Sequence, residues 1–332
     1  MTCSAGSTVL ASLQACGMDT SCIRRLSREY HPASRTAQYV AINDANKNLV
    51  LAMADMGIFS THSFPTYWSS AVAGSKPKWL VVDGNWAERD IRTWVQAGQR
   101  HHARVAFEPV SVEKSARLFC SGSAFKGLER LGIYPHASVD LATPNQYELA
   151  AMHAAARDHE YLGDAGWWEV IDALGMQGAR DRFVKLTSAG MTDAGIPQQA
   201  VQLLPYIPTI VTKLGGRGAL LTAILERDDP RLRDAASEPF ILARSFGDHP
   251  DVGGVYMRLY PSVEEVENVE SVNGAGDTFL GVLVAGLAQG GRVENLVDVA
   301  QRGAVLTLHS RESVSEDLEA LEKDLVAAAG NY

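Results

Sequence analysis

Short apolar runs alternate with helix-like hydrophobic patterns along most of this chain. A run of about five apolar residues predicts a buried strand, whereas apolar residues spaced three and four apart predict a helix with one buried face. We expect strands at Trp79–Asp83, Arg104–Phe107 and Val139–Ala142, and helices at Thr8–Cys16, Ala87–Ala97, Val112–Phe119 and from Asn145 onward. Strands that alternate with helices predict a parallel sheet covered on both faces.

The rest of the pattern predicts smaller features around this sheet. Arg35–Asp44 and Asn48–Asp55 read as two strands joined by Asp44-Ala45-Asn46-Lys47, which predicts a β-hairpin. A helical stretch is expected at about Gly166–Leu204, and the charged stretch Arg227–Pro250 is expected to be a surface excursion. The later strands are expected at Thr209–Lys213, Ala219–Leu225, Gly254–Tyr260 and Val266–Val272, before a helix pattern that begins at Phe279.

The sequence Asn273-Gly274-Ala275-Gly276-Asp277 lies between the last predicted strand and this helix. Small residues let the backbone turn tightly and bring N–H groups close to an anion, and the helix adds its positive dipole end. Asp277 would stand beside that anion and accept a proton from an attacking hydroxyl. The alternative is that Asp277 only caps the helix. The first interpretation is phosphoryl-transfer chemistry without a Walker loop.

Two further motifs carry candidate chemistry. Asn145 and Glu148 open a predicted helix, and their oxygens could hold a hydrated magnesium ion; the alternative is a capping box. Lys213–Gly218 joins two strands and is either a plain glycine turn or a loop under a nucleotide. Two predicted strands end in polar stretches, Asp83-Gly84-Asn85 and the stretch from Glu108, and open parallel sheets bind ligands at such ends. The alternative is that these residues only form turns and helix caps.

Composition narrows the class of protein. The chain has 332 residues, enough for one large α/β domain, and a formal net charge of -9 that argues against a nucleic-acid-binding surface. The longest apolar stretch, around Leu280–Ala288, is too short to span a bilayer, and no signal-peptide pattern is visible. The four cysteines lack metal-binding spacing. We therefore expect a cytoplasmic protein without nucleic-acid or membrane partners.

Together these motifs resemble those of the PfkB (ribokinase-like) carbohydrate kinases. Val272–Gly281 resembles the second signature of the family, Asn145 with Glu148 resembles its Asn-x-x-Glu element, and Lys213–Gly218 resembles its nucleotide loop. The resemblance implies one α/β domain over residues 1–332, with a doubly wound, mainly parallel sheet and a small β lid. It also implies Asp277 as catalytic base with the amides of Gly274, Ala275 and Gly276 as anion hole, Asn145 and Glu148 for Mg2+, and Lys213, Gly215, Gly218 and Asn273 for ATP.

Other stretches look like the pseudouridine kinase branch of this family. They are Arg35–Ala41 with Asp44, Leu49–Met56, Phe107–Ser111 and the Val-Asn form of the glycine motif. The resemblance implies that the hairpin, about residues 35–56, is part of a lid over the sugar. It places Gln38 and Tyr39 near the substrate, and Asn85 and Glu108, which follow predicted strands, are expected to bind the substrate at the rim of the same cleft. The implied reaction is ATP- and Mg2+-dependent phosphorylation of a primary hydroxyl on a sugar or nucleoside, with the 5′-OH of pseudouridine as the acceptor.

The chain departs from the family pattern at its N-terminus. The family begins with a strand and a Gly-Gly…Asn element that grips sugar hydroxyls, whereas Met1 is followed almost at once by the helix after that segment. We therefore expect an N-terminally truncated domain. The alternatives are a non-catalytic nucleotide-binding remnant and a ribokinase- or adenosine-kinase-like enzyme with another acceptor. A homodimer and a former fusion to a glycosidase domain are left open as partners.

Overall fold

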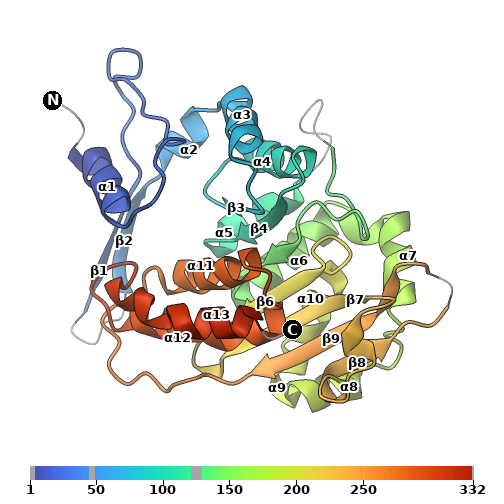
Figure 1. The fold of residues 1–332 in the computed structure, drawn as a ribbon. Helices are drawn as coiled ribbons and strands as arrows, with labels where there is room; N and C mark the ends of the chain where they lie inside the picture. The colour runs from blue at the N-terminus through green and yellow to red at the C-terminus, as the bar shows by residue number, and fades with distance from the viewer. Residues whose placement is uncertain (1–3, 45–48, 121–128, 248, 331–332) are drawn as a thin grey trace.

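The computed structural model describes residues 4–44, 49–120, 129–247 and 249–330, with elements labelled as in Figure 1. The helices are α1 (Ser4–Ala15), α2 (Gly57–Thr61), α3 (Pro65–Ser75), α4 (Glu88–Arg100), α5 (Val112–Ser115), α6 (Gln146–Asp158), α7 (Ala165–Ala173), α8 (Arg180–Leu186), α9 (Ala189–Asp193), α10 (Ile196–Leu203), α11 (Ala275–Ala288), α12 (Val293–Leu308) and α13 (Glu322–Gly330). The strands are β1 (Gln38–Asn43), β2 (Leu49–Asp55), β3 (Trp79–Asp83), β4 (Arg104–Glu108), β5 (Leu141–Ala142), β6 (Thr209–Lys213), β7 (Ala219–Glu226), β8 (Ile241–Arg244) and β9 (Val252–Tyr260).

Across the described residues, the central sheet has seven strands in the order β3-β4-β5-β6-β7-β9-β8. The pairings from β3 to β6 are parallel, and those from β6 through β7 and β9 to β8 are antiparallel. Because two successive reversals restore the direction, β9 runs with the four parallel strands and only β7 and β8 oppose them. The predicted mainly parallel sheet is confirmed.

Alternate residues of the strands face two different helix layers. Val105 and Phe107 of β4 belong to a core built with α4, α6, α7 and α10, whereas Ala106 belongs to a second core built with α11 and α12. On β6 the same alternation separates Ile210 from Val211. Successive side chains of a strand point to opposite faces, so nearly continuous apolar strands bury both faces of the sheet. Figure 1 shows the helices α11 to α13 layered over one side of the sheet.

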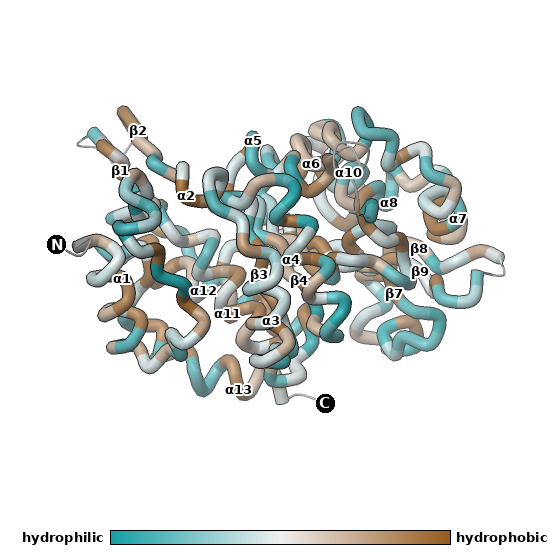
Figure 2. Tube along the Cα trace, turned by 90° about the horizontal axis from the view of Figure 1, so that it is seen from above, coloured by the Kyte–Doolittle hydropathy of each residue, from teal (hydrophilic) through white to brown (hydrophobic). Residues whose placement is uncertain are grey.

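The hairpin β1–β2 forms a separate two-stranded sheet beside α1, at some distance from the central sheet (Figure 1). Its ladder runs from Gln38 opposite Asp55 to Asn43 opposite Leu49, as the sequence predicts. Residues Ala45, Asn46 and Lys47 of the predicted turn lie outside the described residues. Figure 2 shows the hairpin extending away from the body. Its exposed apolar side chains are Tyr39, Val40, Ile42, Val50, Leu51 and Met53.

Three expectations from the sequence are wrong. Val266–Val272 is not a strand. The backbone N–H of Glu270 donates at 2.8 Å to the carbonyl oxygen of Leu308, the last residue of α12, instead of pairing with a sheet. The helix expected from Phe279 begins at Ala275, so the glycine motif is its first turn. The stretch expected to be a surface excursion contains β8, an edge strand paired with β9. Within the described ranges no helix has the length and apolar character needed to cross a bilayer.

Candidate active site

Polar side chains gather where the parallel strands β3 to β6 end. Asp83 ends β3 and lies opposite Glu108, which ends β4. Thr143 follows β5 directly, and Lys213 ends β6. The carboxyl ends of parallel strands meet at one edge of a sheet, which is where open α/β sheets bind ligands. Strand polarity alone therefore brings together residues that are far apart in the sequence.

Lys213 and Glu108 form the central ion pair of this edge. The Lys213 Nζ donates to Glu108 Oε1 at 2.9 Å, and the Thr143 Oγ1 donates to Glu108 Oε2 at 2.6 Å. The Glu108 residue is 5% exposed. Burial raises the pKa of Glu108, while the Lys213 charge lowers it and the Glu148 charge raises it further. The buried carboxylate is thus tied to its neighbours through both oxygens.

The first turn of α11 packs directly against this ion pair. Gly274 precedes the helix with φ 79°, and a Cβ on it would lie 1.7 Å from the carbonyl oxygen of Ser313, so only glycine fits. A Cβ on Gly276 would lie 3.0 Å from Lys213 Nζ. The backbone therefore requires glycine at position 274, whereas at position 276 a side chain would displace the ammonium group beside it.

Asp277 occupies the same first turn of α11 and reaches solvent. Partial burial raises the pKa of Asp277, the Lys213 charge lowers it, and the Asp83 charge raises it. The helix turn that carries Asp277 lies against the end of β6, because a Cβ on Gly276 would be 3.0 Å from Lys213 Nζ. Asp277 does not cap α11, because the N-cap residue is Gly274. The carboxylate is thus available at the helix terminus where an anion would bind.

Asn145 and Glu148 form a full capping box at the start of α6. Asn145 Oδ1 accepts from the N–H groups of Tyr147 at 2.9 Å and Glu148 at 3.0 Å, and Glu148 Oε2 accepts from the Asn145 N–H at 2.7 Å. Asn145 is bridged through its backbone to Lys213. The alternative noted from the sequence is therefore present in the structure, at the same sheet edge as the ion pair.

The capping box uses one Glu148 oxygen and leaves the other, which is a ligand of the kind that a partly hydrated magnesium ion prefers. The Glu148 charge also repels the charge of Glu108 and raises its pKa. A divalent cation would offset that repulsion. In the ranges described, no three His, Cys, Asp or Glu side chains form a metal cluster. Mg2+ often binds through one or two carboxylates, waters and substrate phosphates.

The glycine loop between β6 and β7 lies beside Lys213. Gly218 has φ 88°, and a Cβ there would lie 1.9 Å from the carbonyl oxygen of Tyr260, so its glycine is fixed by the backbone. Gly215 has φ 62°, but no atom lies within 4 Å of the Cβ position. The loop is open at Gly215 and tightly packed at Gly218. Arg217 of the same loop donates to Gln146 Oε1 at 2.6 Å, which links it to the start of α6.

A second polar group surrounds the turn after β3. The Lys114 Nζ donates to Asn85 Oδ1 at 2.6 Å, which leaves the amide NH2 of Asn85 to face other partners. Arg117 donates to the carbonyls of Gly84 and Asn85 at 3.1 Å and 3.3 Å. Val110, in the next turn, has φ 69°, a strained value for a β-branched residue. Both turns are thus held in fixed geometry beside the cluster.

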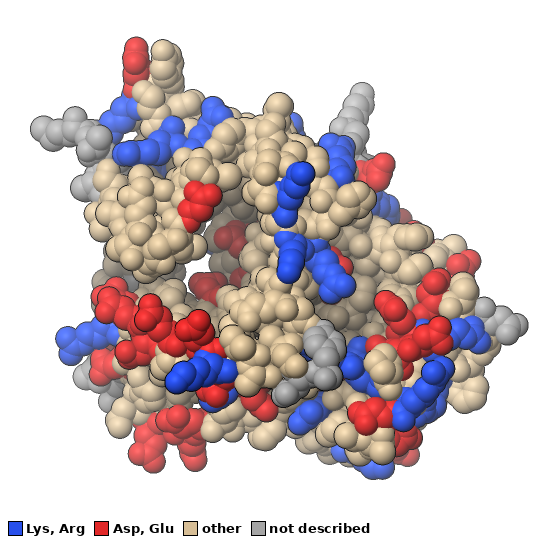
Figure 3. Space-filling model, in the orientation of Figure 1, with Lys and Arg blue, Asp and Glu red and all other residues tan. Residues whose placement is uncertain are grey.

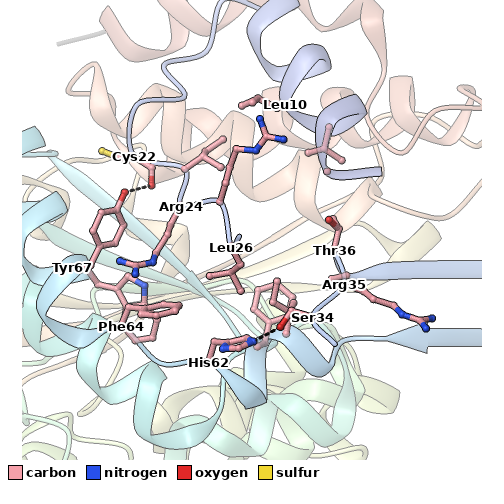
Figure 4. A pocket seen from close by; sticks show the side chains of 18 of the residues that line it. Leu10, Cys22, Arg24, Leu26, Ser34, Arg35, Thr36, His62, Phe64 and Tyr67 are labelled. Atoms are coloured by element: carbon pink, nitrogen blue, oxygen red, sulfur yellow. Dashed lines mark hydrogen bonds between the residues drawn. The ribbon is translucent and has the colours of Figure 1, made fainter. Parts of the chain in front are cut away.

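A deep hollow with acidic side chains inside it separates the part carrying α1 and the hairpin from the part carrying α11 and α12 (Figure 3). A cavity of 890 Å³ lies between the N-terminal segment and α2, α3 and α4. In Figure 4 the Arg24 side chain lies along Phe64, with its guanidinium 4.0 Å from the ring centroid. Trp86 lines the cavity directly after Asn85, so the cavity adjoins the turn after β3.

The structure brings most of the predicted site residues together. Gly276, Asp277, Lys213 and Glu108 form one cluster with Asn145 and Glu148 beside it, whereas Asn85 belongs to the neighbouring turn. Ala275 is the first helical residue of α11, next to Gly274. Gln38 and Tyr39 are exposed on β1, which among the described strands pairs with β2 alone, and Asn273 precedes the helix. The binding roles of these three residues stay predictions.

Thr143 was not predicted from the sequence, whereas Asp83 and Lys114 were predicted only as parts of stretches that line the rim of the cleft. Asp83 was part of the predicted rim, and its position at the end of β3, like that of Glu108 on β4, was the available signal. Thr143 carries the same signal, because it directly follows β5. Lys114 belongs to the predicted stretch from Glu108, but its contact with Asn85 depends on how α5 packs on the turn.

The comparisons with known proteins agree with this geometry. The sequence profile of the pfkB family carbohydrate kinases matches residues 257–320, which include Asp277. The pseudouridine-metabolizing bifunctional protein of Schizosaccharomyces pombe is 31% identical over 293 residues, covering 87% of this chain and 36% of that protein. The chain therefore spans little more than a third of that relative's length.

Solved structures give the fold. Ribokinase from Cryptococcus neoformans, in complex with ADP, has a TM-score of 0.57 at 15% identity, covering 96% of this chain and 79% of that one. Nucleoside kinase from Burkholderia thailandensis, in complex with inosine, has a TM-score of 0.54 at 12% identity, covering 97% and 76%. The chain has a ribokinase-like fold, and its residues 257–320 match the pfkB family. The resemblance to PfkB kinases is thereby confirmed, and kinases of that family are phosphotransferases with alcohol groups as acceptors.

Proposed function

We propose that the chain is an ATP-dependent kinase that transfers the γ-phosphoryl group to a primary hydroxyl of a sugar or nucleoside, with the 5′-OH of pseudouridine as the acceptor. The observation that carries the proposal is the position of Asp277 in the first turn of α11, within reach of the Lys213 and Asp83 charges. The pseudouridine-metabolizing relative supports the choice of acceptor. The inosine complex of the nucleoside kinase supports an acceptor of nucleoside size.

In the proposed reaction, the acceptor oxygen attacks the γ-phosphorus while the bond from that phosphorus to the β–γ bridging oxygen breaks. Asp277 takes the hydroxyl proton, and ADP leaves. The backbone N–H groups of Gly274, Ala275 and Gly276 would donate to the transferred group, since preorganised donors stabilise charge that develops in the transition state. Gly215 and Gly218 would shape the loop under the nucleotide, with Asn273 beside it.

Other predicted site residues, apart from Lys213 and Glu108, also have a place in this scheme. Asn145 and Glu148 would hold Mg2+, which neutralises phosphate charge when bound. Asn85, with its amide oxygen held by Lys114, would offer its NH2 group to acceptor hydroxyls. The cavity beside Trp86 has aromatic walls on which a nucleobase would stack, and its 890 Å³ suits a ligand of that size. Gln38 and Tyr39 would close over the acceptor from the hairpin.

The decisive variant is Asp277→Asn, which keeps the size of the side chain and removes its basicity. We expect turnover to fall by at least about 10²-fold, the lower range for loss of a general base, while ADP affinity measured by calorimetry stays within about twofold. The assay is ADP release with pseudouridine, uridine, inosine and ribose as acceptors. Near-normal turnover in the variant would refute Asp277 as the base. No phosphotransfer by the wild type to any acceptor would favour the non-catalytic alternative, and a preference for ribose or inosine would reassign the acceptor.

A further inference from the structure

The buried Glu108 carboxylate has an arrangement that its predicted contact with substrate does not explain. One oxygen accepts from Lys213 at 2.9 Å and the other from Thr143 at 2.6 Å. The residue is 5% exposed. These two bonds leave further lone pairs on the carboxylate, but its burial leaves an acceptor hydroxyl little access to them.

The Lys213 ammonium held by this carboxylate lies against the anion-binding turn. A Cβ on Gly276 would be 3.0 Å from Lys213 Nζ and 3.8 Å from Cε. The ammonium therefore occupies the space that the absent side chain of Gly276 leaves beside the first turn of α11. An ammonium has three N–H donors, and the bond to Glu108 uses one. The Lys213 side chain is 17% exposed, so part of it faces the solvent side of the cluster.

We propose that Glu108 is a positioning residue: it holds the Lys213 ammonium beside Gly276, where the ammonium faces the phosphoryl group in transfer, and it does not contact the acceptor. This inference rests on the proposed kinase function. A lysine side chain has four rotatable bonds and loses much rotamer freedom when it is fixed. Glu108 fixes it before substrate binds, so the positive charge is already in place when negative charge develops on the phosphoryl oxygens.

A double-mutant cycle tests the role of Glu108 through kinetics. Lys213→Met should lower kcat by roughly 10²-fold, and Glu108→Gln by roughly tenfold to 10²-fold, with the acceptor KM unchanged within about twofold. In the Lys213→Met background, Glu108→Gln should have little further effect on kcat. Independent, multiplying effects would overturn the inference, as would a raised acceptor KM with unchanged kcat. The matched control removes the exposed ion pair between Arg302 and Asp324, whose charged groups are 2.7 Å apart, by Arg302→Met and Asp324→Asn. These substitutions should leave kcat unchanged.

A binding measurement separates this inference from the proposed function. Calorimetry with AMP-PNP and ADP gives the preference for the γ-phosphate without turnover. We expect Lys213→Met and Glu108→Gln each to lower that preference, and the double variant to lower it no further than Lys213→Met. If the wild type shows this cycle but transfers phosphate to no acceptor, the kinase proposal fails and the positioning role stands. If the pair had a merely structural role, the variants would melt at a lower temperature but keep the preference for AMP-PNP over ADP. That result would refute the positioning role, as would a wild type that binds no nucleotide.

Discussion

A single methyl group added at Gly276 tests the geometry of the site most directly. The Cβ of Gly276→Ala would lie 3.0 Å from Lys213 Nζ, closer than the ordinary contact of about 3.5 Å or more between non-bonded heavy atoms. The ammonium must therefore move by roughly half an ångström. The same ammonium donates to Glu108 at 2.9 Å, so its movement would change the length of that hydrogen bond.

Gly276→Ala should have little effect on stability but should lower activity. Alanine is favoured over glycine inside a helix by about 1 kcal/mol, and the lysine side chain can yield, so we expect the free energy of unfolding to change by no more than about 1 kcal/mol. A displacement of about 1 Å in a catalytic group can lower the rate by roughly 10²-fold. For half that displacement we expect kcat/KM to fall about tenfold, which corresponds to about 1.4 kcal/mol of transition-state stabilisation.

The assay pairs urea denaturation with ADP-release kinetics, and the same helix supplies the control. No atom lies within 4 Å of the Cβ position of Gly281, an exposed residue of α11. Gly281→Ala should therefore stabilise the protein by up to about 1 kcal/mol and leave kcat/KM unchanged. Full activity in Gly276→Ala, together with the same stabilisation, would show that the ammonium does not act from the position described.

Two further predictions concern the same first turn of α11. The Lys213 charge lowers the pKa of Asp277 against the raising effect of burial, and the base must be deprotonated to act. Lys213→Met should therefore raise that pKa and move the acidic limb of the kcat/KM profile to higher pH; a limb that stays in place, measured from pH 4 to 9, would separate Lys213 from the titrating group. Gly274→Ala should lower the free energy of unfolding by at least about 2 kcal/mol, since it combines φ 79° with a Cβ 1.7 Å from the Ser313 carbonyl oxygen. Urea denaturation measures that loss, and unchanged stability would contradict this description of the turn.

The sheet and most of its strand ends could be predicted from the sequence because both faces are buried. Trp79–Asp83 and Thr209–Lys213 have the predicted bounds, since a short apolar run ended by a charged residue marks where a buried strand reaches the surface. A strand end also indicated Glu108 as a site residue, whereas Lys213 was indicated by the glycine loop that it begins. In an open parallel sheet, ligands bind at the carboxyl ends of the strands. A polar residue that follows a predicted strand can therefore be placed at the site before any tertiary contact is known.

Other features depend on contacts that no local pattern records. Val266–Val272 has valines typical of a strand, but Glu270 bonds to the end of α12, and only the tertiary fold provides that partner. The edge strand β8 is short and lies among charged residues, which hides it from an apolar-run criterion. The pairing of Lys213 with Glu108 likewise joins two positions that the sequence analysis had placed in separate roles, nucleotide and acceptor.

The ion pair between Lys213 and Glu108 has a consequence for the order in which the protein folds. Lys213 and Glu108 are separated by 105 positions, and α11, which packs on both, comes later still in the chain. Closing such long loops is entropically costly and slow compared with forming local helices. The proposed nucleotide site would therefore be complete only once β4, β6 and α11 have come together. Recovery of ADP affinity during refolding would accordingly report the last assembly step, well after helical circular dichroism has returned.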